Sequence, residues 1–220
     1  MRKEVIAKID AQKLVAIVRG IADKEQCQQT AAAIVAGGIS CIEVTFNQNA
    51  PEKFTDTTNA IRAIGAYLGD KVCVGAGTVM TPDQVRMAHD AGAKYIISPD
   101  ANEEIIRLTC DLGLVSIPGV LTPTEIVKAI DAGADYAKLF PAGLFGPAYL
   151  KALKAPLNHI KMLAVGGVDA SNIPAFLQAG CDGFGIGGNL VNKAWIEAGQ
   201  YEKITAVAKE MVGAVNSVAK

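Results

Sequence analysis

The sequence predicts a single α/β domain, a closed (β/α)8 TIM barrel of parallel strands that spans residues 1–220. Two observations predict this fold. Short apolar runs alternate with helical patterns along the whole chain, and no linker or low-complexity segment divides it. A helix-ending Ala-Gly or Leu-Gly pair also recurs a few residues before a strand. It occurs at Ala36-Gly37, Ala91-Gly92, Leu112-Gly113, Ala132-Gly133 and Ala179-Gly180.

The expected elements follow in chain order. Eight apolar runs are interpreted as strands, at residues 14–19, 40–45, 72–76, 94–98, 114–117, 135–140, 161–165 and 183–186. Helix starts are indicated by cap or proline signals at Thr81-Pro82-Asp83, Thr122-Pro123-Thr124-Glu125 and Asp169-Ala170-Ser171-Asn172. Residues 201–220 are expected to form a terminal helix. Eight repeating units favour a closed barrel. The alternative is a doubly wound open sheet, although Arg19-Gly20-Ile21-Ala22 follows the first strand in place of a dinucleotide fingerprint.

Bulk composition narrows the function classes. A net charge of −1 gives no basic surface for nucleic acid. No apolar run approaches the roughly 18 residues of a membrane span, and Met1–Val5 does not resemble a signal peptide. Five scattered cysteines show no metal-ligand spacing, and their odd number favours a reducing compartment. Cys41 and Cys73 fall in predicted strands and are interpreted as small core residues. We therefore expect a cytoplasmic protein without nucleic-acid or membrane partners.

Lys138 is the first candidate for chemistry. It stands near the carboxyl end of the predicted strand at 135–140, where parallel barrels carry their ligands. Burial disfavours the ammonium, so its pKa should fall below the usual value of about 10.4. A neutral amine is a nucleophile toward carbonyl carbons. Lys71, Lys94 and Lys161 stand instead at the amino ends of strands, where charge is hydrated. The alternative for Lys138 is a side chain that extends from the strand end into water.

Glu43 and Arg19 are the next candidates. Strand alternation places Cys41, Glu43 and Thr45 on the inner face of the barrel. A buried carboxylate needs a partner or a catalytic role, so Glu43 is either a proton-transfer group or half of a structural ion pair with Lys138 or Arg19. Arg19 closes the first strand and could bind a carboxylate or phosphate, or hold Glu43.

Loops after three strands carry candidate binding groups. Thr78 follows the third strand behind two glycines, and its hydroxyl could donate to a carboxylate, although a plain turn explains the motif equally well. Gly166-Gly167 and Gly187-Gly188 follow the last two strands, where barrels often bind phosphate through backbone N–H groups. The alternative for both glycine pairs is a tight turn.

Metal chemistry is not expected. The chain has two histidines. His89 lies in a predicted helix, and His159 precedes the seventh strand, at the end of the barrel away from the candidate site. A metal-dependent enzyme acting on a carbonyl would be expected to need histidine ligands, whereas an amine that serves as an electron sink needs none.

These segments, taken in order, resemble the class I 2-keto-3-deoxy-6-phosphogluconate (KDPG) and 4-hydroxy-2-oxoglutarate (KHG) aldolase family. The likeness covers nearly the whole barrel, and the pairing of Lys138-Leu139-Phe140-Pro141-Ala142 with an upstream Glu43-Val44-Thr45 is specific. The other matching segments are Ile17-Val18-Arg19-Gly20, Val74-Gly75-Ala76-Gly77-Thr78-Val79, Ile97-Ser98-Pro99, Ile117-Pro118-Gly119, Gly166-Gly167-Val168 and Gly185-Ile186-Gly187-Gly188.

The resemblance implies a barrel assembled as a homotrimer, with no cofactor and no metal. It implies that Lys138 forms the Schiff base and that Glu43 moves protons. Arg19 and Thr78 would position the pyruvyl end of the substrate, and Pro99 would shape its pocket. The phosphate would be held by Gly166, Gly167, Gly187 and Gly188.

The expected reaction is cleavage of 2-dehydro-3-deoxy-6-phosphogluconate to pyruvate and glyceraldehyde 3-phosphate, with KHG cleavage to pyruvate and glyoxylate as a possible second activity. Four positions depart from the phosphogluconate pattern, namely Asn47 for arginine, Ala164-Val165 for Pro-Thr, and Gly188 for serine. Ala164-Val165 and Phe145-Gly146-Pro147 are more similar to the branch that cleaves the 6-phosphogalactonate epimer, which is the alternative substrate. More distant alternatives are a sugar-phosphate isomerase or epimerase that uses Glu43 as base, and a non-catalytic sugar-phosphate binder.

Overall fold

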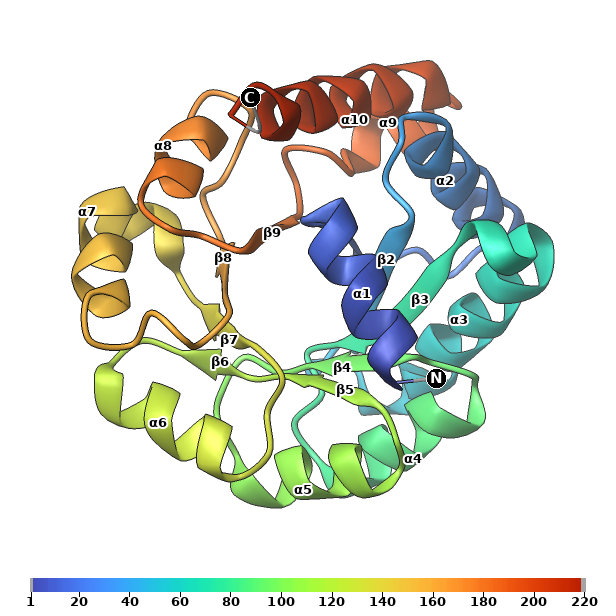
Figure 1. The fold of residues 1–220 in the computed structure, drawn as a ribbon. Helices are drawn as coiled ribbons and strands as arrows, with labels where there is room; N and C mark the ends of the chain where they lie inside the picture. The colour runs from blue at the N-terminus through green and yellow to red at the C-terminus, as the bar shows by residue number, and fades with distance from the viewer. Residues whose placement is uncertain (1, 219–220) are drawn as a thin grey trace.

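The computed structural model describes residues 2–218, which form a barrel of parallel strands ringed by helices (Figure 1). The strands are β1 (Leu14–Val18), β2 (Cys41–Thr45), β3 (Cys73–Gly77), β4 (Tyr95–Ile97), β5 (Val115–Ile117), β6 (Gly119–Val120), β7 (Ala137–Leu139), β8 (Met162–Val165) and β9 (Gly183–Ile186). The α-helices are α1 (Arg2–Gln12), α2 (Lys24–Ala36), α3 (Phe54–Leu68), α4 (Pro82–Asp90), α5 (Glu103–Asp111), α6 (Pro123–Asp131), α7 (Ala142–Lys154), α8 (Ile173–Gln178), α9 (Lys193–Glu197) and α10 (Tyr201–Asn216). Two 3₁₀ turns, η1 (Pro51–Lys53) and η2 (Gly69–Lys71), flank α3.

The strands run in the order β5-β4-β3-β2-β1-β9-β8-β7-β6, and every adjacent pair is parallel. All eight predicted strand positions carry a strand, and the prediction of a barrel rather than an open sheet is confirmed. The expected strand at 114–117 extends further and is divided at Pro118 into β5 and β6, because proline has no N–H to donate to the ladder. Lys138 N donates to Pro118 O at 2.8 Å, which closes the ring between these two pieces and β7.

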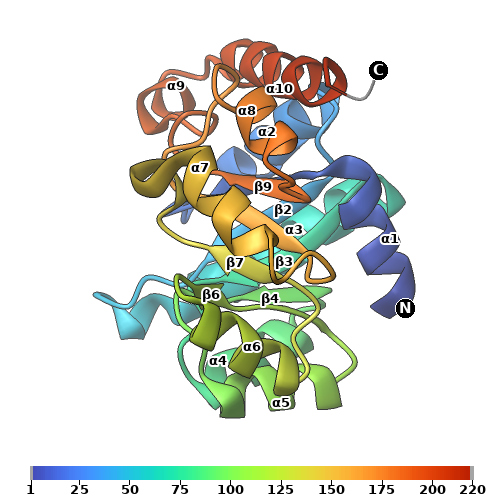
Figure 2. The same ribbon diagram turned by 60° about the vertical axis from the view of Figure 1, so that its left-hand side comes forward.

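Helix α1 lies across the amino end of the barrel (Figures 1 and 2). This helix was not predicted from the sequence. Its buried side chains Val5 and Ile9 join the cluster inside the barrel. Tyr136 fixes the helix in place, because its hydroxyl donates to Ile6 O at 3.1 Å and to Asp10 Oδ1 at 2.7 Å. Helix α1 therefore covers part of the amino end, and the carboxyl ends of the strands are where parallel barrels carry their active sites.

The helices that ring the strands bury a second, larger apolar layer. Helix α10 completes the ring between α2 and α8 (Figure 1). It approaches α2 so closely that a Cβ at Gly37 would overlap the Ala208 side chain. The glycines that end helices at 92, 113, 133 and 180 have φ between 73° and 109°, as the recurring pair predicts. After α2 the residue in the left-handed conformation is Gly38, one position after Gly37 of the Ala36-Gly37 pair.

All three predicted signals lie at the start of a helix. Thr81 and Thr122 each form a capping box, followed by proline in the first turn. The third signal also precedes a helix directly, because α8 begins at Ile173 with Asn172 as its N-cap residue. Asp169 does not cap it, since Asp169 Oδ1 accepts from the Ser171 N–H at 2.9 Å and so closes a local turn. The expected terminal helix is α10, although residues 219–220 lie outside the described part of the chain.

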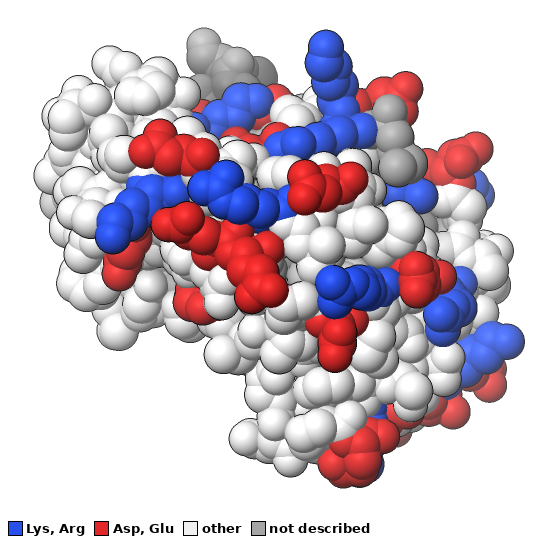
Figure 3. Space-filling model, turned by 90° about the horizontal axis from the view of Figure 1, so that it is seen from below, with Lys and Arg blue, Asp and Glu red and all other residues white. Residues whose placement is uncertain are grey.

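No helix among residues 2–218 is both long and apolar enough to cross a bilayer. On the face seen in Figure 3, Lys and Arg side chains are interspersed with Asp and Glu, so that face has no continuous surface of one sign.

Candidate active site

Lys138 and Glu43 point into the barrel from opposite sides. Lys138 lies in the middle of β7, between Ala137 and Leu139, which pack outward against the helices. Glu43 occupies the middle of β2, and β1, β9 and β8 separate the two strands around the ring. Lys138 is 7% exposed and Glu43 is 3% exposed. Strand alternation therefore places both ionisable side chains in the interior, as expected from the sequence.

The amine of Lys138 is held by uncharged groups. Its Nζ donates to the main-chain oxygen of Ser98 at 2.9 Å and lies 5.1 Å from the centre of the Phe140 ring. Burial lowers the pKa of Lys138, and the charge of Arg19 lowers it further, while Glu43 and Asp100 oppose this change. Among the described residues, no carboxylate oxygen comes within ion-pair distance of this amine. The environment therefore increases the fraction of the neutral, nucleophilic amine relative to an exposed lysine.

Burial shifts the pKa of the Glu43 carboxyl group in the opposite direction to that of Lys138. Burial raises its pKa to about 7, although the charges of Lys138 and Arg19 hold it lower than burial alone would. The structural ion pair considered from the sequence does not form, because neither cation lies within ion-pair distance of Glu43 in the described structure. Gly77 on β3 provides the space, since a Cβ there would overlap Glu43 Oε1. A carboxyl group with a pKa near neutrality can both accept and donate protons.

Three further predicted residues lie at the carboxyl ends of strands, on the same side of the barrel. Arg19 follows β1 and is exposed. Thr78 follows β3 in a left-handed conformation with φ of 53°, and its carbonyl accepts from Gln48 Nε2 at 2.6 Å. Pro99 follows β4 and is half-buried. The charge of Arg19 acts on both Lys138 and Glu43, so its guanidinium belongs to this electrostatic environment.

The two glycine pairs form adjacent loops after β8 and β9. Asn189 Nδ2 donates to Val168 O at 3.1 Å and joins the loops. The carbonyls of Gly166, Gly167 and Gly187 accept hydrogen bonds from Gly143 N, from Asn172 Nδ2, and from both Leu190 N and Val191 N, respectively. Within the described residues, no protein group accepts from the N–H groups of Gly166, Gly167, Gly187 or Gly188. Four backbone donors thus lie at the mouth of the barrel, a pattern suited to an anion.

Several contributors to the site were missed from the sequence. Ser98 supplies a carbonyl to the lysine, and its own Oγ donates to Asp100 O at 2.8 Å, which fixes the turn. Phe140 packs its ring beside the amine. Gln48 supports the β3 loop, since it also accepts from Gln84 Nε2 at 3.1 Å. The contact from Ser98 O cannot be predicted from the sequence, because every residue has a main-chain carbonyl.

The positions that depart from the phosphogluconate pattern have local roles. Asn47 is exposed, and its Oδ1 accepts from the Asn49 N–H at 3.1 Å. Gly146 has φ of 74° and interrupts α7 just before Pro147.

His89 and His159 are both exposed, and the described residues contain no cluster of three or more metal-ligating side chains.

Comparison with known proteins agrees with this geometry. The family profile described as KDPG and KHG aldolase matches residues 5–207. The chain is 40% identical over 178 residues to a 2-dehydro-3-deoxy-6-phosphogalactonate aldolase of Escherichia coli (strain K12), which covers 80% of this chain and 83% of the relative. It is 34% identical over 193 residues to the KHG/KDPG aldolase of the same strain, which covers 86% and 85%.

A solved structure shows the same fold. The KDPG aldolase from Legionella pneumophila, with pyruvate captured at low pH as a covalent carbinolamine intermediate, superposes with a TM-score of 0.83 at 26% identity. The match covers 93% of this chain and 96% of that chain. Aldolases are carbon–carbon lyases, and the fold, the profile and both relatives agree. The chain belongs to the KDPG and KHG aldolase family.

Proposed function

We propose that this protein is a class I aldolase that forms a Schiff base through Lys138 and splits a 2-keto-3-deoxy-6-phospho sugar acid into pyruvate and glyceraldehyde 3-phosphate. One observation supports this most directly. A buried lysine with a lowered pKa and a buried carboxyl group with a pKa of about 7 face the same interior without forming an ion pair. A purely structural pair would be in contact.

The reaction begins at the amine. Neutral Lys138 Nζ attacks the C2 ketone and gives a carbinolamine, which loses water to become a protonated imine. This imine withdraws electrons from C3. When the C4 hydroxyl loses its proton, the C3–C4 bond breaks, its electrons pass into an enamine, and the aldehyde departs. Protonation of the enamine at C3 and hydrolysis then release pyruvate and restore Lys138.

Glu43 carries the protons in these steps. Its carboxylate takes the C4 hydroxyl proton, directly or through water, and its carboxylic acid returns a proton to C3. One group can perform both tasks because its pKa of about 7 leaves both forms populated near neutrality.

The remaining predicted residues hold the substrate. The phosphate binds the free N–H groups of Gly166, Gly167, Gly187 and Gly188. Arg19 and Thr78 contact the carboxylate of the pyruvyl end, since Asn47 stands where phosphogluconate-type members commonly have arginine, and its side chain bonds within its own turn. Pro99 packs against the pyruvyl group beside the Ser98 carbonyl.

Substrate choice concerns the C4 configuration. The gluconate epimer, with KHG as a second substrate, is the first expectation from the resemblance. Identity of 40% to a phosphogalactonate aldolase, against 34% to a KHG/KDPG aldolase, supports the galactonate epimer as a second candidate. Val165, at the end of β8 just before the glycine loop, is one of the positions that differ from the gluconate pattern. Cleavage rates for both epimers and for KHG decide between these substrates.

A trapping experiment tests the central step. The protein is incubated with pyruvate, reduced with borohydride, digested, and analysed by mass spectrometry. We expect the pyruvate-derived mass on the peptide that carries Lys138, with no gain on a peptide that carries Lys161, the matched control that directly precedes β8. Absence of an adduct would favour an isomerase that uses Glu43 as base, or a sugar-phosphate binder.

We also propose a cytoplasmic homotrimer, on the basis of the family resemblance. Sedimentation equilibrium of the purified protein measures the number of subunits, and cell fractionation tests the location.

A further inference from the structure

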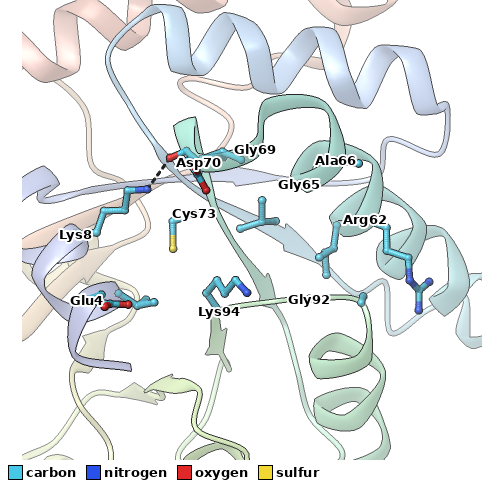
Figure 4. Close-up of a pocket in the computed structure, with 15 residues that line it drawn as sticks. Glu4, Lys8, Arg62, Gly65, Ala66, Gly69, Asp70, Cys73, Gly92 and Lys94 are labelled. Atoms are coloured by element: carbon cyan, nitrogen blue, oxygen red, sulfur yellow. Dashed lines mark hydrogen bonds between the residues drawn. The ribbon is translucent and has the colours of Figure 1, made fainter. Parts of the chain in front are cut away.

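A cleft lies at the amino end of the barrel, away from the candidate active site. It has a volume of about 640 Å³ and lies between α1, α3, the first residues of β3 and the segment just before β4 (Figure 4). Lys8, Arg62 and Lys94 contribute positive charge to its wall, and Glu4 and Asp70 contribute negative charge. The sulfur of Cys73 points into the space between Lys8 and Lys94. The proposed aldol reaction uses none of these residues.

Cys73 has a second thiol directly beside it. Cys41 on β2 and Cys73 on β3 are register partners, and both side chains belong to the cluster inside the barrel. Adjacent strands lie about 4.7–4.9 Å apart, which is within the usual Cα separation of about 4.4–6.8 Å for a disulfide. The other three cysteines, Cys27, Cys110 and Cys181, each donate to a main-chain carbonyl.

The two thiols are electrostatically unequal. The Cys41 thiol hydrogen-bonds to Cys73 and lowers the pKa of Cys73, and the charges of Lys8 and Lys94 lower it further against the effect of burial. The same hydrogen bond, together with burial, raises the pKa of Cys41. Cys73 lines the cleft and is 4% exposed, whereas Cys41 is fully buried behind it. The thiol with more thiolate character is thus the one that a small molecule can reach.

We propose that Cys41 and Cys73 form a redox-active dithiol, which a small hydroperoxide entering through this cleft converts to an intramolecular disulfide. The Cys73 thiolate attacks one peroxide oxygen, the O–O bond breaks, and the leaving oxygen takes a proton to become water or an alcohol. Cys73 is now a sulfenic acid. The Cys41 sulfur attacks it, the S–O bond breaks, and the departing hydroxide takes the Cys41 proton as water. Two electrons pass from the two sulfurs to the peroxide, and an added dithiol reverses the reaction.

The test reads the covalent state directly, so it does not depend on aldolase activity. The reduced, folded full-length protein is treated with limiting hydrogen peroxide, free thiols are alkylated under denaturing conditions, and the digest is analysed without reduction. We expect a cross-linked peptide that joins Cys41 to Cys73 with the loss of two hydrogen atoms, and its disappearance after dithiothreitol. This link should form before Cys110 is modified, although Cys110 is the more exposed thiol.

Matched variants sharpen the result. Cys181→Ala removes another buried thiol and should leave the link unchanged, whereas Cys73→Ala should abolish it and leave Cys41 free. Lys94→Gln should slow cross-linking by roughly three- to tenfold, because the thiolate fraction falls when a nearby cation is removed. In the protein without substitutions, oxidation confined to Cys110, or a sulfinic acid on Cys73 with Cys41 still alkylated, would overturn the proposal. This outcome can be read even if a variant does not fold.

Discussion

Basic and acidic side chains form ion pairs at the amino end of this barrel, whereas, among residues 2–218, those inside its carboxyl half do not. At the amino end, lysine, arginine and aspartate form close pairs: Lys161 with Asp10 at 2.6 Å, Arg2 with Asp135 at 2.9 Å, and Lys154 with Asp182 at 2.6 Å. Toward the carboxyl end, Lys138 and Glu43 are more deeply buried and form no such pair in the described structure.

The difference separates stability from reactivity. The carboxylates at the amino end also accept backbone hydrogen bonds, as Asp135 does from Ser116 N at 2.9 Å and Asp182 from Met162 N at 2.8 Å. These contacts satisfy the charge and tie neighbouring strands together. At the other end, burial without an ion-pair partner shifts both pKa values toward neutrality. Substitutions at the two ends should therefore change different properties.

The largest effect is expected for Lys138→Arg. It should lower kcat/KM by about 10³-fold or more, because a guanidinium does not lose its proton and cannot form the imine. Steady-state cleavage assays measure the loss, and circular dichroism checks the fold. Lys161→Arg is the control at the amino end and should keep its turnover, since arginine can still pair with Asp10. Substantial cleavage by Lys138→Arg would remove the proposed role of this residue.

Glu43→Gln should lower kcat by roughly 10²- to 10⁴-fold, the usual contribution of a general acid–base group. Borohydride trapping should still label Lys138 in this variant. In the unchanged protein, kcat should fall as the pH drops through about 7, because the carboxylate that accepts the C4 proton becomes protonated. Profiles of kcat against pH for both proteins provide the comparison. A variant that keeps the same acidic limb would show that another group is titrating.

The same carboxyl group should make stability depend on pH. Its pKa is 4.5 ordinarily and about 7 in the folded protein, so between these values the folded state holds a proton that the unfolded state has lost. Stability should therefore decrease as the pH rises from about 4.5 to 7, by about 3 kcal/mol in total from this group. Urea unfolding at several pH values measures this loss. Glu43→Gln should lack this component, and an identical pH dependence in both proteins would contradict the assignment.

At the amino end, Asp135→Ala should destabilise the fold by about 2–3 kcal/mol, because the buried Ser116 N–H and the Arg2 guanidinium lose their acceptor. Activity of the folded protein should be unchanged. Asp90→Ala is the control, since Asp90 is exposed and pairs only with His89 in the described structure, and a change within about 0.5 kcal/mol is expected. Urea unfolding and cleavage assays on the same samples separate the two properties. If Asp135→Ala lost activity but kept its stability, the conclusion that ion pairs at the amino end serve stability rather than reactivity would be wrong.

Much of the fold could be predicted from local patterns. Apolar runs located all eight strand positions, and two proline-bearing capping signals located helix starts at Pro82 and Pro123. The same reasoning missed α1, which has only two buried side chains, Val5 and Ile9, and a weak apolar periodicity. Helix α1 joins the core because Val5 and Ile9 pack against apolar side chains inside the barrel, and the fold brings those side chains together only when the strands close.

The sequence by itself determined that Lys138 and Glu43 face the barrel interior, because side chains alternate along a strand with a fixed period of two residues. Only the tertiary structure decided their environments. It brought the Ser98 carbonyl to the amine, made room for Glu43 beside Gly77, and set Cys41 against Cys73. Those contacts join residues far apart in the chain, and strand register and barrel closure, rather than local pattern, determine which of them meet.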